Sequence, residues 1–314
     1  MPTTNEIKHC ANCGAEASKR CLGCIDAPEY HDGDATETVY CNPDCQRKNW
    51  PTHKPRCLQL KKRIMLSRIG YLMKAAVIAY QSCAFSVNLT AMEMRDGTLW
   101  LTFGPFGNPG IAAFPENLTT DENLRETALL NNQCMAALYL GAPLARHLFP
   151  AVNPITIRRL DVPIKAVIPY KVTDMEWDPE HTIVQIQLGD EFWILDVTGR
   201  QYGFPEFLLP LHTYERTKVS GGVISNEYYK GDYDIYDETG DLVELIDETQ
   251  TQNQEGRLTA QLKARLHFTD FAETHFNNIS AKVFLSGSEE EFRSRVGSFV
   301  DKVKTLMTNF ISSD

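Results

Sequence analysis

Seven cysteines and one histidine in the first fifth of this 314-residue chain form four closely spaced pairs. The pairs are Cys10/Cys13, Cys21/Cys24, Cys41/Cys45 and His53/Cys57. Zinc takes thiolate and imidazole ligands four at a time, and two ligands separated by two or three residues can reach one ion from a single turn. The eight ligands therefore predict two tetrahedral zinc ions.

The spacing inside the pairs indicates how the chain presents them. The first two pairs have the two-residue gap of a zinc knuckle, in which a tight turn aims both sulfurs inward. The last two pairs have a three-residue gap, so each pair can lie on one face of a helical turn. Four such pairs can be shared between two ions in more than one way, and the spacing leaves this choice open.

The order C-x2-C, C-x2-C, C-x3-C, H-x3-C resembles a MYND-type zinc finger over about residues 10 to 57. Gln46 directly after Cys45 and the run Trp50-Pro51-Thr52-His53 belong to the same pattern. The resemblance implies interleaved ligand pairs, with one zinc on Cys10, Cys13, Cys41 and Cys45 and the other on Cys21, Cys24, His53 and Cys57. Both sites are then structural, because no coordination position remains for a water molecule.

The segment between Cys24 and Cys41 is longer than is usual in that family. It contains Asp26, Glu29, Asp32, Asp34 and Glu37. We interpret it as a solvated acidic loop. His31 in this loop has no partner at ligand spacing and is not predicted to bind zinc. The basic patch of Lys54, Arg56, Lys61, Lys62 and Arg63 is interpreted as a solvated helix face, with a nuclear-import signal as the alternative.

Composition favours an intracellular protein of the nucleus or cytoplasm. The opening sequence MPTTNEIKHC contains no apolar signal segment, which favours reduced, metal-bound cysteines over a set of disulfides. No stretch approaches the ~20 apolar residues of a membrane span. The net charge of −10 argues against general nucleic-acid binding, which needs a basic face.

The resemblance also implies a partner for the finger. Members of the MYND family bind short proline-containing peptides, and the glutamine and tryptophan of this stretch contribute to the groove. These residues are Gln46 and Trp50, which are four apart and therefore on one helix face. An exposed tryptophan can pack against a proline ring while a side-chain amide forms a hydrogen bond with the extended backbone. The alternative is that Trp50 only covers the second zinc. We expect an adaptor or regulatory protein that binds a proline-containing peptide of a partner protein.

We expect an α+β fold in three parts. These are a small two-zinc cross-braced finger over residues 1–58, a linking helix over 59–83, and a mixed α+β domain over 84–314 with antiparallel hairpins and C-terminal helices. An acidic insertion is predicted at about 221–256, where acids outnumber bases.

Local patterns predict several elements of the larger domain. Asp96-Gly97 and Gly189-Asp190 each lie between two strand-like runs and predict hairpins. Residues 121–148 predict helix, interrupted near Asn131-Asn132 or at 141–143. The run from Ser288 to Glu291 has the pattern of a capping box, and the helix that follows carries an apolar stripe that we expect to be core.

A second functional hypothesis rests on Cys134, His181 and Asp196. Cys134 is predicted at or near a helix start, His181 opens a strand, and Asp196 ends the next strand. A thiol at a helix N-terminus has a lowered pKa, a histidine can deprotonate it, and a carboxylate can orient that histidine.

This order of residues resembles transglutaminase-like and papain-like cysteine enzymes. The region after the finger is also similar to uncharacterised regions that follow MYND fingers in fungal proteins. The alternative is that the three residues are ordinary core and turn residues. A cysteine-dependent hydrolase or transferase is therefore the second hypothesis, behind the adaptor. The finger does not interrupt a SET domain and no NHSC-like segment is present, so a methyltransferase is not expected.

Overall fold

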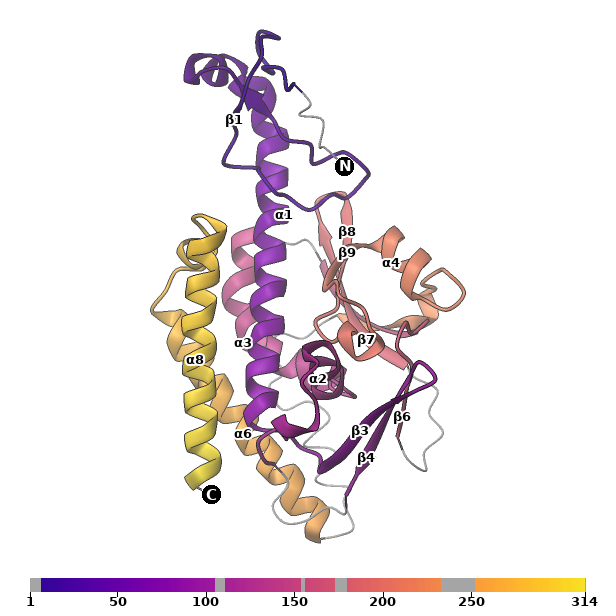
Figure 1. Ribbon diagram of the computed structural model, residues 1–314. Helices are drawn as coiled ribbons and strands as arrows, with labels where there is room; N and C mark the ends of the chain where they lie inside the picture. Colours follow the sequence, from indigo (N-terminus) through magenta and orange to yellow (C-terminus); the bar gives the residue numbers. More distant parts are fainter. Residues whose placement is uncertain (1–6, 105–110, 154–155, 173–179, 233–251, 314) are drawn as a thin grey trace. The chain divides into compact units, whose positions relative to one another are not determined.

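The computed structural model describes residues 7–104, 111–153, 156–172, 180–232 and 252–313 (Figure 1). The chain divides into two compact units, an N-terminal unit up to Arg68 and a C-terminal unit from Ile69. This division falls inside helix α1 (Pro43–Cys83), whereas the sequence placed the end of the finger at residue 58. Helices combined with mainly antiparallel strands confirm the predicted α+β class.

The N-terminal unit has little regular structure before α1. Strands β1 (Lys19–Arg20) and β2 (Val39–Tyr40) form a two-stranded antiparallel pair. The core of the unit is small, and ligand cysteines make up much of it; its buried members are Cys10, Ala17, Cys21, Cys24, Ala27, Val39, Tyr40, Cys57 and Leu60. So few apolar side chains give limited hydrophobic stabilisation, and the unit therefore depends on its metal ligands.

Helix α1 confirms the helix predicted after the finger, but it begins much earlier, at Pro43. Proline suits a first helical position because its missing N–H would have no partner there. Pro51 and Pro55 lie inside the same helix. Each removes one helical hydrogen bond, so tertiary and metal contacts must hold this stretch in place.

The acidic loop is not simply solvated, which corrects the prediction for Asp34 and for Arg63 of the basic patch. Both guanidinium Nη atoms of Arg63 donate to the Asp34 carboxylate at 2.8 Å, and Arg63 is buried. Burial alone disfavours the carboxylate, but Arg63 and backbone N–H groups hold the pKa of Asp34 below its ordinary value. Arg56 donates to the carbonyl oxygens of Asp34 and Thr36 at 3.0 and 2.9 Å. These contacts fasten the loop to α1.

The C-terminal unit contains a three-stranded sheet built on the first predicted hairpin. Strand β3 (Leu89–Arg95) pairs antiparallel with β4 (Thr98–Phe103), and β6 (Tyr170–Val172) runs parallel to β4. The two turn residues Asp96 and Gly97 have φ of 49° and 76°. Positive φ at both positions is the requirement of a type I′ turn, so the Asp-Gly signal is confirmed.

The second sheet of this unit has five antiparallel strands in the order β10-β5-β7-β8-β9. Its strands are β5 (Thr156–Pro163), β7 (Glu180–Leu188), β8 (Glu191–Leu195), β9 (Leu208–Pro210) and β10 (Tyr229–Asp232). The turn at Gly189-Asp190 joins β7 to β8 and confirms the second hairpin. The predicted acidic insertion at about 221–256 contains β10, and its residues 233–251 lie outside the described residues.

Six further α-helices are described in this unit: α2 (Glu122–Leu129), α3 (Cys134–Val152), α4 (Leu211–Lys218), α6 (Gln252–Asn277), α7 (Ala281–Phe284) and α8 (Glu289–Ser313). Short 3-10 helices lie at Glu116–Leu118, Gly199–Tyr202 and Asn226–Tyr228. Helix α3 packs against β7 and α6, and α6 lies beside α8 (Figure 1). No helix among the described residues is long and apolar enough to cross a bilayer.

The helix boundaries follow the sequence signals. The interruption in 121–148 occurs at Asn131-Asn132, where Asn132 has φ 54°, and Pro143 lies inside α3. The capping box is formed, because Ser288 N–H donates to Glu291 Oε2 at 2.7 Å and Glu291 N–H donates to Ser288 Oγ at 3.2 Å. The stripe on α8 is largely core; its buried residues are Phe292, Val296, Phe299, Val303 and Met307.

Two helical glycines provide a matched test of packing in the C-terminal unit. A Cβ at Gly70 of α1 would lie 2.7 Å from Leu195 Cδ1 and 2.9 Å from Phe207 Cδ2, whereas one at the exposed Gly297 of α8 would meet nothing within 4 Å. We expect Gly297→Ala to raise the free energy of unfolding by about 0.5–1 kcal/mol. Gly70→Ala is expected to lower it by about 1 kcal/mol or more through overpacking. Urea unfolding checks both values, and equal stabilisation by the two variants would contradict the tight contact at Gly70.

Candidate functional site

The eight predicted metal ligands gather into two groups of four. One group contains Cys10, Cys13, Cys41 and Cys45, and the other contains Cys21, Cys24, His53 and Cys57. The ligand atoms of each group all lie within 4.8 Å of one another. The interleaved grouping implied by the MYND resemblance is therefore confirmed.

Distances between ligand atoms fit tetrahedral zinc. Zn–S bonds of ≈ 2.3 Å place two sulfurs on one tetrahedral ion about 3.8 Å apart. Cys13 and Cys41 Sγ are 3.7 Å apart, and Cys21 and Cys57 Sγ are 3.8 Å apart. Cys24 Sγ lies 3.6 Å from His53 Nε2. None of the nine cysteines forms a disulfide, so the disulfide alternative is not supported.

Local structure explains how each pair is presented. Cys41 follows β2 directly, and Cys45 lies in the first turn of α1. His53 and Cys57 lie further along α1 on neighbouring turns. The side chain of Asn42 accepts the backbone N–H of Cys45 at 2.9 Å, which stabilises the start of the helix. In the CLGC knuckle, a Cβ at Gly23 would lie 3.3 Å from Cys57 Sγ, so a small residue keeps the turn close to the ligands.

The two centres differ in exposure. All four ligands of the Cys21 group are buried, whereas Cys13 is exposed and Cys41 and Cys45 are half-buried in the other group. Burial raises the pKa of the Cys24 and Cys57 thiols. Zinc binds thiolates, so metal binding at the buried centre must release protons.

Comparison with protein families identifies the segment that holds both centres. The MYND finger family matches residues 10–57, the span from the first ligand to the last. Residues 10–57 are a MYND finger. No curated protein and no solved structure matches the chain. MYND fingers mediate protein–protein interaction, so the N-terminal unit carries a zinc-binding interaction domain.

Gln46 and Trp50, the predicted peptide-binding residues, both lie beside the buried zinc group of the MYND finger. The Gln46 side-chain amide donates to Cys21 Sγ at 3.9 Å. The Trp50 ring meets His53 edge-on with centroids 6.1 Å apart, yet Trp50 remains 38% exposed. Leu22, which lies inside the CLGC knuckle, is 82% exposed. The sequence analysis missed Leu22, although an apolar residue in a knuckle turn was a signal.

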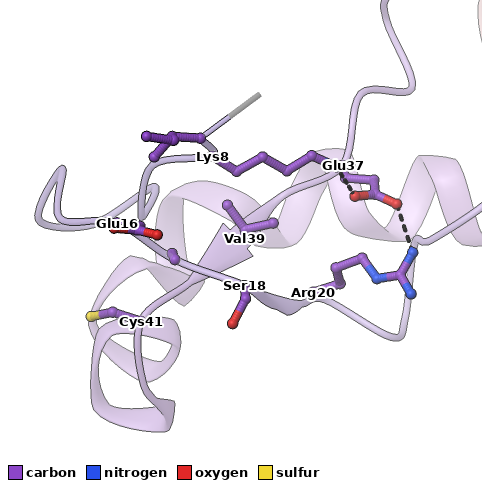
Figure 2. A pocket seen from close by; sticks show the side chains of 9 residues that line it. Lys8, Glu16, Ser18, Arg20, Glu37, Val39 and Cys41 are labelled. Carbon is purple, nitrogen blue, oxygen red and sulfur yellow. Dashed lines mark hydrogen bonds and ion pairs between the residues drawn. The ribbon is translucent and has the colours of Figure 1, made fainter. Parts of the chain in front are cut away.

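An open groove of about 660 Å³ lies elsewhere on the finger, at the β1–β2 pair (Figure 2). Its lining includes Lys8, Arg20, Glu37 and Val39 but neither Gln46 nor Trp50. Glu37 pairs with both Lys8 and Arg20, so these charges satisfy one another. The groove therefore offers no unpaired charge from these three residues to attract a ligand.

The C-terminal unit brings the three residues of the second hypothesis together. His181 Nε2 lies 2.8 Å from Asp196 Oδ1, and both residues are buried. Because a carboxylate only accepts, the Nε2–H of His181 donates to it. Cys134, which is half-buried, interacts with the same imidazole.

Three elements position this cluster. Cys134 is the first residue of α3, His181 is the second residue of β7, and Asp196 follows the end of β8. The turn before Cys134 is held by Gln201, whose Oε1 accepts the Asn132 N–H at 3.0 Å. The helix start is held further by a 2.7 Å hydrogen bond from Gln81 to Gln133, both buried.

The charges of the cluster support one another. Burial disfavours the imidazolium, but the Asp196 carboxylate and the Cys134 side chain outweigh it and raise the pKa of His181 to about 10. Burial likewise disfavours the thiolate, but His181 and Thr182 hold the pKa of Cys134 below its ordinary value. Both directions favour a thiolate–imidazolium pair.

Two residues that the sequence analysis did not single out complete the surroundings of Asp196. Tyr214 donates its hydroxyl to Asp196 Oδ2 at 2.8 Å, and burial beside this carboxylate raises the pKa of Tyr214 well above its ordinary value. Gly199 allows close approach, because a Cβ there would lie 2.4 Å from Asp196 Oδ2. Gly199 belongs to the DVTG turn, which is a recognisable signal, whereas nothing local links Tyr214 to Asp196.

The metal centres predict a specific stoichiometry. We expect two zinc ions per chain in the purified protein and about one in Cys13→Ser, because that substitution removes an exposed ligand of one group and leaves the buried group complete. Cys83→Ser is the matched control and should keep two, since Cys83 belongs to neither group. Inductively coupled plasma mass spectrometry gives the counts. Fewer than two zinc ions in the unaltered protein would contradict the assignment.

Proposed function

We propose that the MYND finger is the docking module of an adaptor or regulatory protein and binds a short proline-containing segment of a partner protein. The supporting observation is the exposure of Trp50 at 38% although its ring packs against the zinc ligand His53. A residue that served only to cover the metal centre would present less of its ring to solvent. The exposed part of the ring can pack against a proline ring.

Leu22, Gln46 and Trp50 define a patch around the buried zinc group, which we call the knuckle patch. Leu22 lies between Cys21 and Cys24 in the chain, Gln46 contacts Cys21, and Trp50 contacts His53. Each member is therefore fixed to a ligand of one metal ion. A patch held by coordination bonds is preorganised, which reduces the entropy that binding must overcome.

The chemistry of the patch suits an extended proline-rich chain. One N–H of the Gln46 amide bonds Cys21 Sγ, and the amide has a second N–H and a carbonyl oxygen. Carbonyl groups of a polyproline II chain have no internal hydrogen-bond partners and can accept from such an N–H. Leu22 and Trp50 supply the apolar contacts for side chains on either side.

Substitution of Trp50 tests this function. We expect Trp50→Ala to weaken binding of a fluorescein-labelled proline-rich peptide by about tenfold or more, the typical effect of a buried aromatic anchor. Leu58→Ala is the control, because Leu58 is also an exposed apolar residue of α1 and makes no part of the patch. Fluorescence anisotropy measures affinity, and zinc content is measured in parallel.

Two results would count against the proposal. Loss of zinc from Trp50→Ala would make this residue a structural cover. Unchanged peptide affinity in Trp50→Ala with zinc retained would move binding to another surface.

A further inference from the structure

We propose that Cys134, His181 and Asp196 form a catalytic centre that transfers a small acyl group from an ester, thioester or amide through a thioester on the Cys134 sulfur. This function belongs to the C-terminal unit and goes beyond peptide docking by the finger. It does not depend on that docking.

The His181–Asp196 pair fixes the role of each imidazole nitrogen. Nε2–H is committed to Asp196 Oδ1 at 2.8 Å, so Nδ1 is the nitrogen that can accept or release a proton. His181 Nδ1 is buried and makes no hydrogen bond of ordinary geometry with any described residue. An unsatisfied buried nitrogen costs free energy. We assign Nδ1 to proton exchange with the neighbouring Cys134 side chain.

Cys134 occupies a position that favours its thiolate. It is the first residue of the 19-residue helix α3, and the N-cap residue Gln133 makes no side-chain capping hydrogen bond. The N–H groups of a first helical turn have no helical partners and attract negative charge. The backbone N–H of Thr182 adds a further interaction, whereas its hydroxyl donates to Asp161 Oδ1 at 2.6 Å. The backbone N–H groups at the start of α3 and of Thr182 can stabilise the oxyanion that forms when the sulfur attacks a carbonyl carbon.

An apolar cavity beside the thiol limits the size of the acyl group. It has a volume of about 20 Å³, and its lining includes Cys134, Ala137, Leu138, Leu195 and Val197. A cavity of this size holds about one water molecule or one methyl group. Cys134 itself is half-buried, so an acyl donor can approach from the surface while an acetyl methyl enters the cavity.

The reaction balances without a further reactant except water or an acceptor nucleophile. The Cys134 thiolate attacks the carbonyl carbon, and a C–S bond forms as the carbonyl π electrons move to oxygen. The oxyanion collapses, the bond to the leaving group breaks, and His181 Nδ1–H protonates that group. A water molecule or amine then attacks the thioester while Nδ1 takes its proton. The carboxylic acid or amide leaves, and the thiolate–imidazolium pair is restored.

Tyr214, Gly199 and Gln201 act as positioning residues. Tyr214 holds the second carboxylate oxygen, Gly199 leaves room for the carboxylate, and Gln201 holds the turn that starts α3. Two segments of the C-terminal unit, the 3-10 helix Gly199–Tyr202 and α4, thus maintain the geometry of one histidine and one thiol.

The first experiment measures alkylation of the zinc-loaded full chain by iodoacetamide between pH 6 and 8. Zinc occupies seven of the nine cysteines, so Cys83 and Cys134 are the two free thiols, and both are half-buried. A thiol of ordinary pKa loses about a hundredfold of its thiolate between pH 8 and pH 6. We expect Cys134 to react at least about tenfold faster than Cys83 at pH 6 and to change by less than about threefold across the range. Peptide mass spectrometry follows each site.

Asp196→Asn keeps the shape of the side chain and removes its charge. The variant is expected to lower the pH 6 alkylation rate of Cys134 by about tenfold or more, because the imidazolium loses its counter-charge. Circular dichroism confirms that the variant is folded. An unchanged pH profile in a folded Asp196→Asn variant would overturn the triad, as would a Cys134 rate that falls with pH like that of an ordinary thiol.

The second experiment tests acyl transfer with p-nitrophenyl acetate as the probe. We expect a burst of p-nitrophenol of about one equivalent per chain and an acetyl thioester on Cys134. Cys134→Ala should abolish both, and Cys83→Ala should change neither. Absence of the acetyl adduct, or equal acetylation of Cys83 and Cys134, would overturn the proposed acyl chemistry even if Cys134 is alkylated rapidly.

Discussion

Shared coordination of sequence-distant ligand pairs is the constraint on which the N-terminal unit depends. Cys10 and Cys13 share an ion with Cys41 and Cys45. The pairs of the second group alternate with these pairs along the chain. Neither ion can be fully coordinated until the knuckles, the β1–β2 pair and the first turns of α1 have met. We therefore expect this unit to fold only when it binds its metal ions. Contacts such as Arg63 with Asp34 then fasten the loop that the ligands enclose.

The C-terminal unit satisfies a different requirement, because its buried polar side chains must find partners within the fold. His181, Asp196 and Tyr214 are all buried and connected by hydrogen bonds of 2.8 Å. Such a network is costly if one member is lost, since the others remain buried and unsatisfied. The placement of Asp196 therefore follows from several segments at once, and this placement fixes which nitrogen of His181 carries the proton shared with the carboxylate.

Sequence reasoning succeeded where the determining interactions are local. Ligand spacing, the Asp96-Gly97 turn and the Ser288–Glu291 capping box each operate over a few residues, and the structure contains all of them. It failed for Asp34, because the partner Arg63 lies 29 residues away and no local pattern links the two. Cys134, His181 and Asp196 could be named from chemistry, but only the packing of α3 on β7 brings the thiol to the imidazole. Tyr214 could not be identified from the sequence for the same reason.

The partner of each thiol determines what its sulfur can do. In the finger, four ligands saturate each zinc, so the coordinated sulfurs make the fold rigid. No coordination site remains to activate a nucleophile. In the C-terminal unit, the group beside Cys134 is an imidazole with a raised pKa, which can gain and lose a proton during a reaction. In the proposed function, recognition by the finger therefore comes from side chains around the closed metal centres, such as Trp50. The proposed covalent chemistry, by the same reasoning, belongs to Cys134, the thiol beside a titratable histidine.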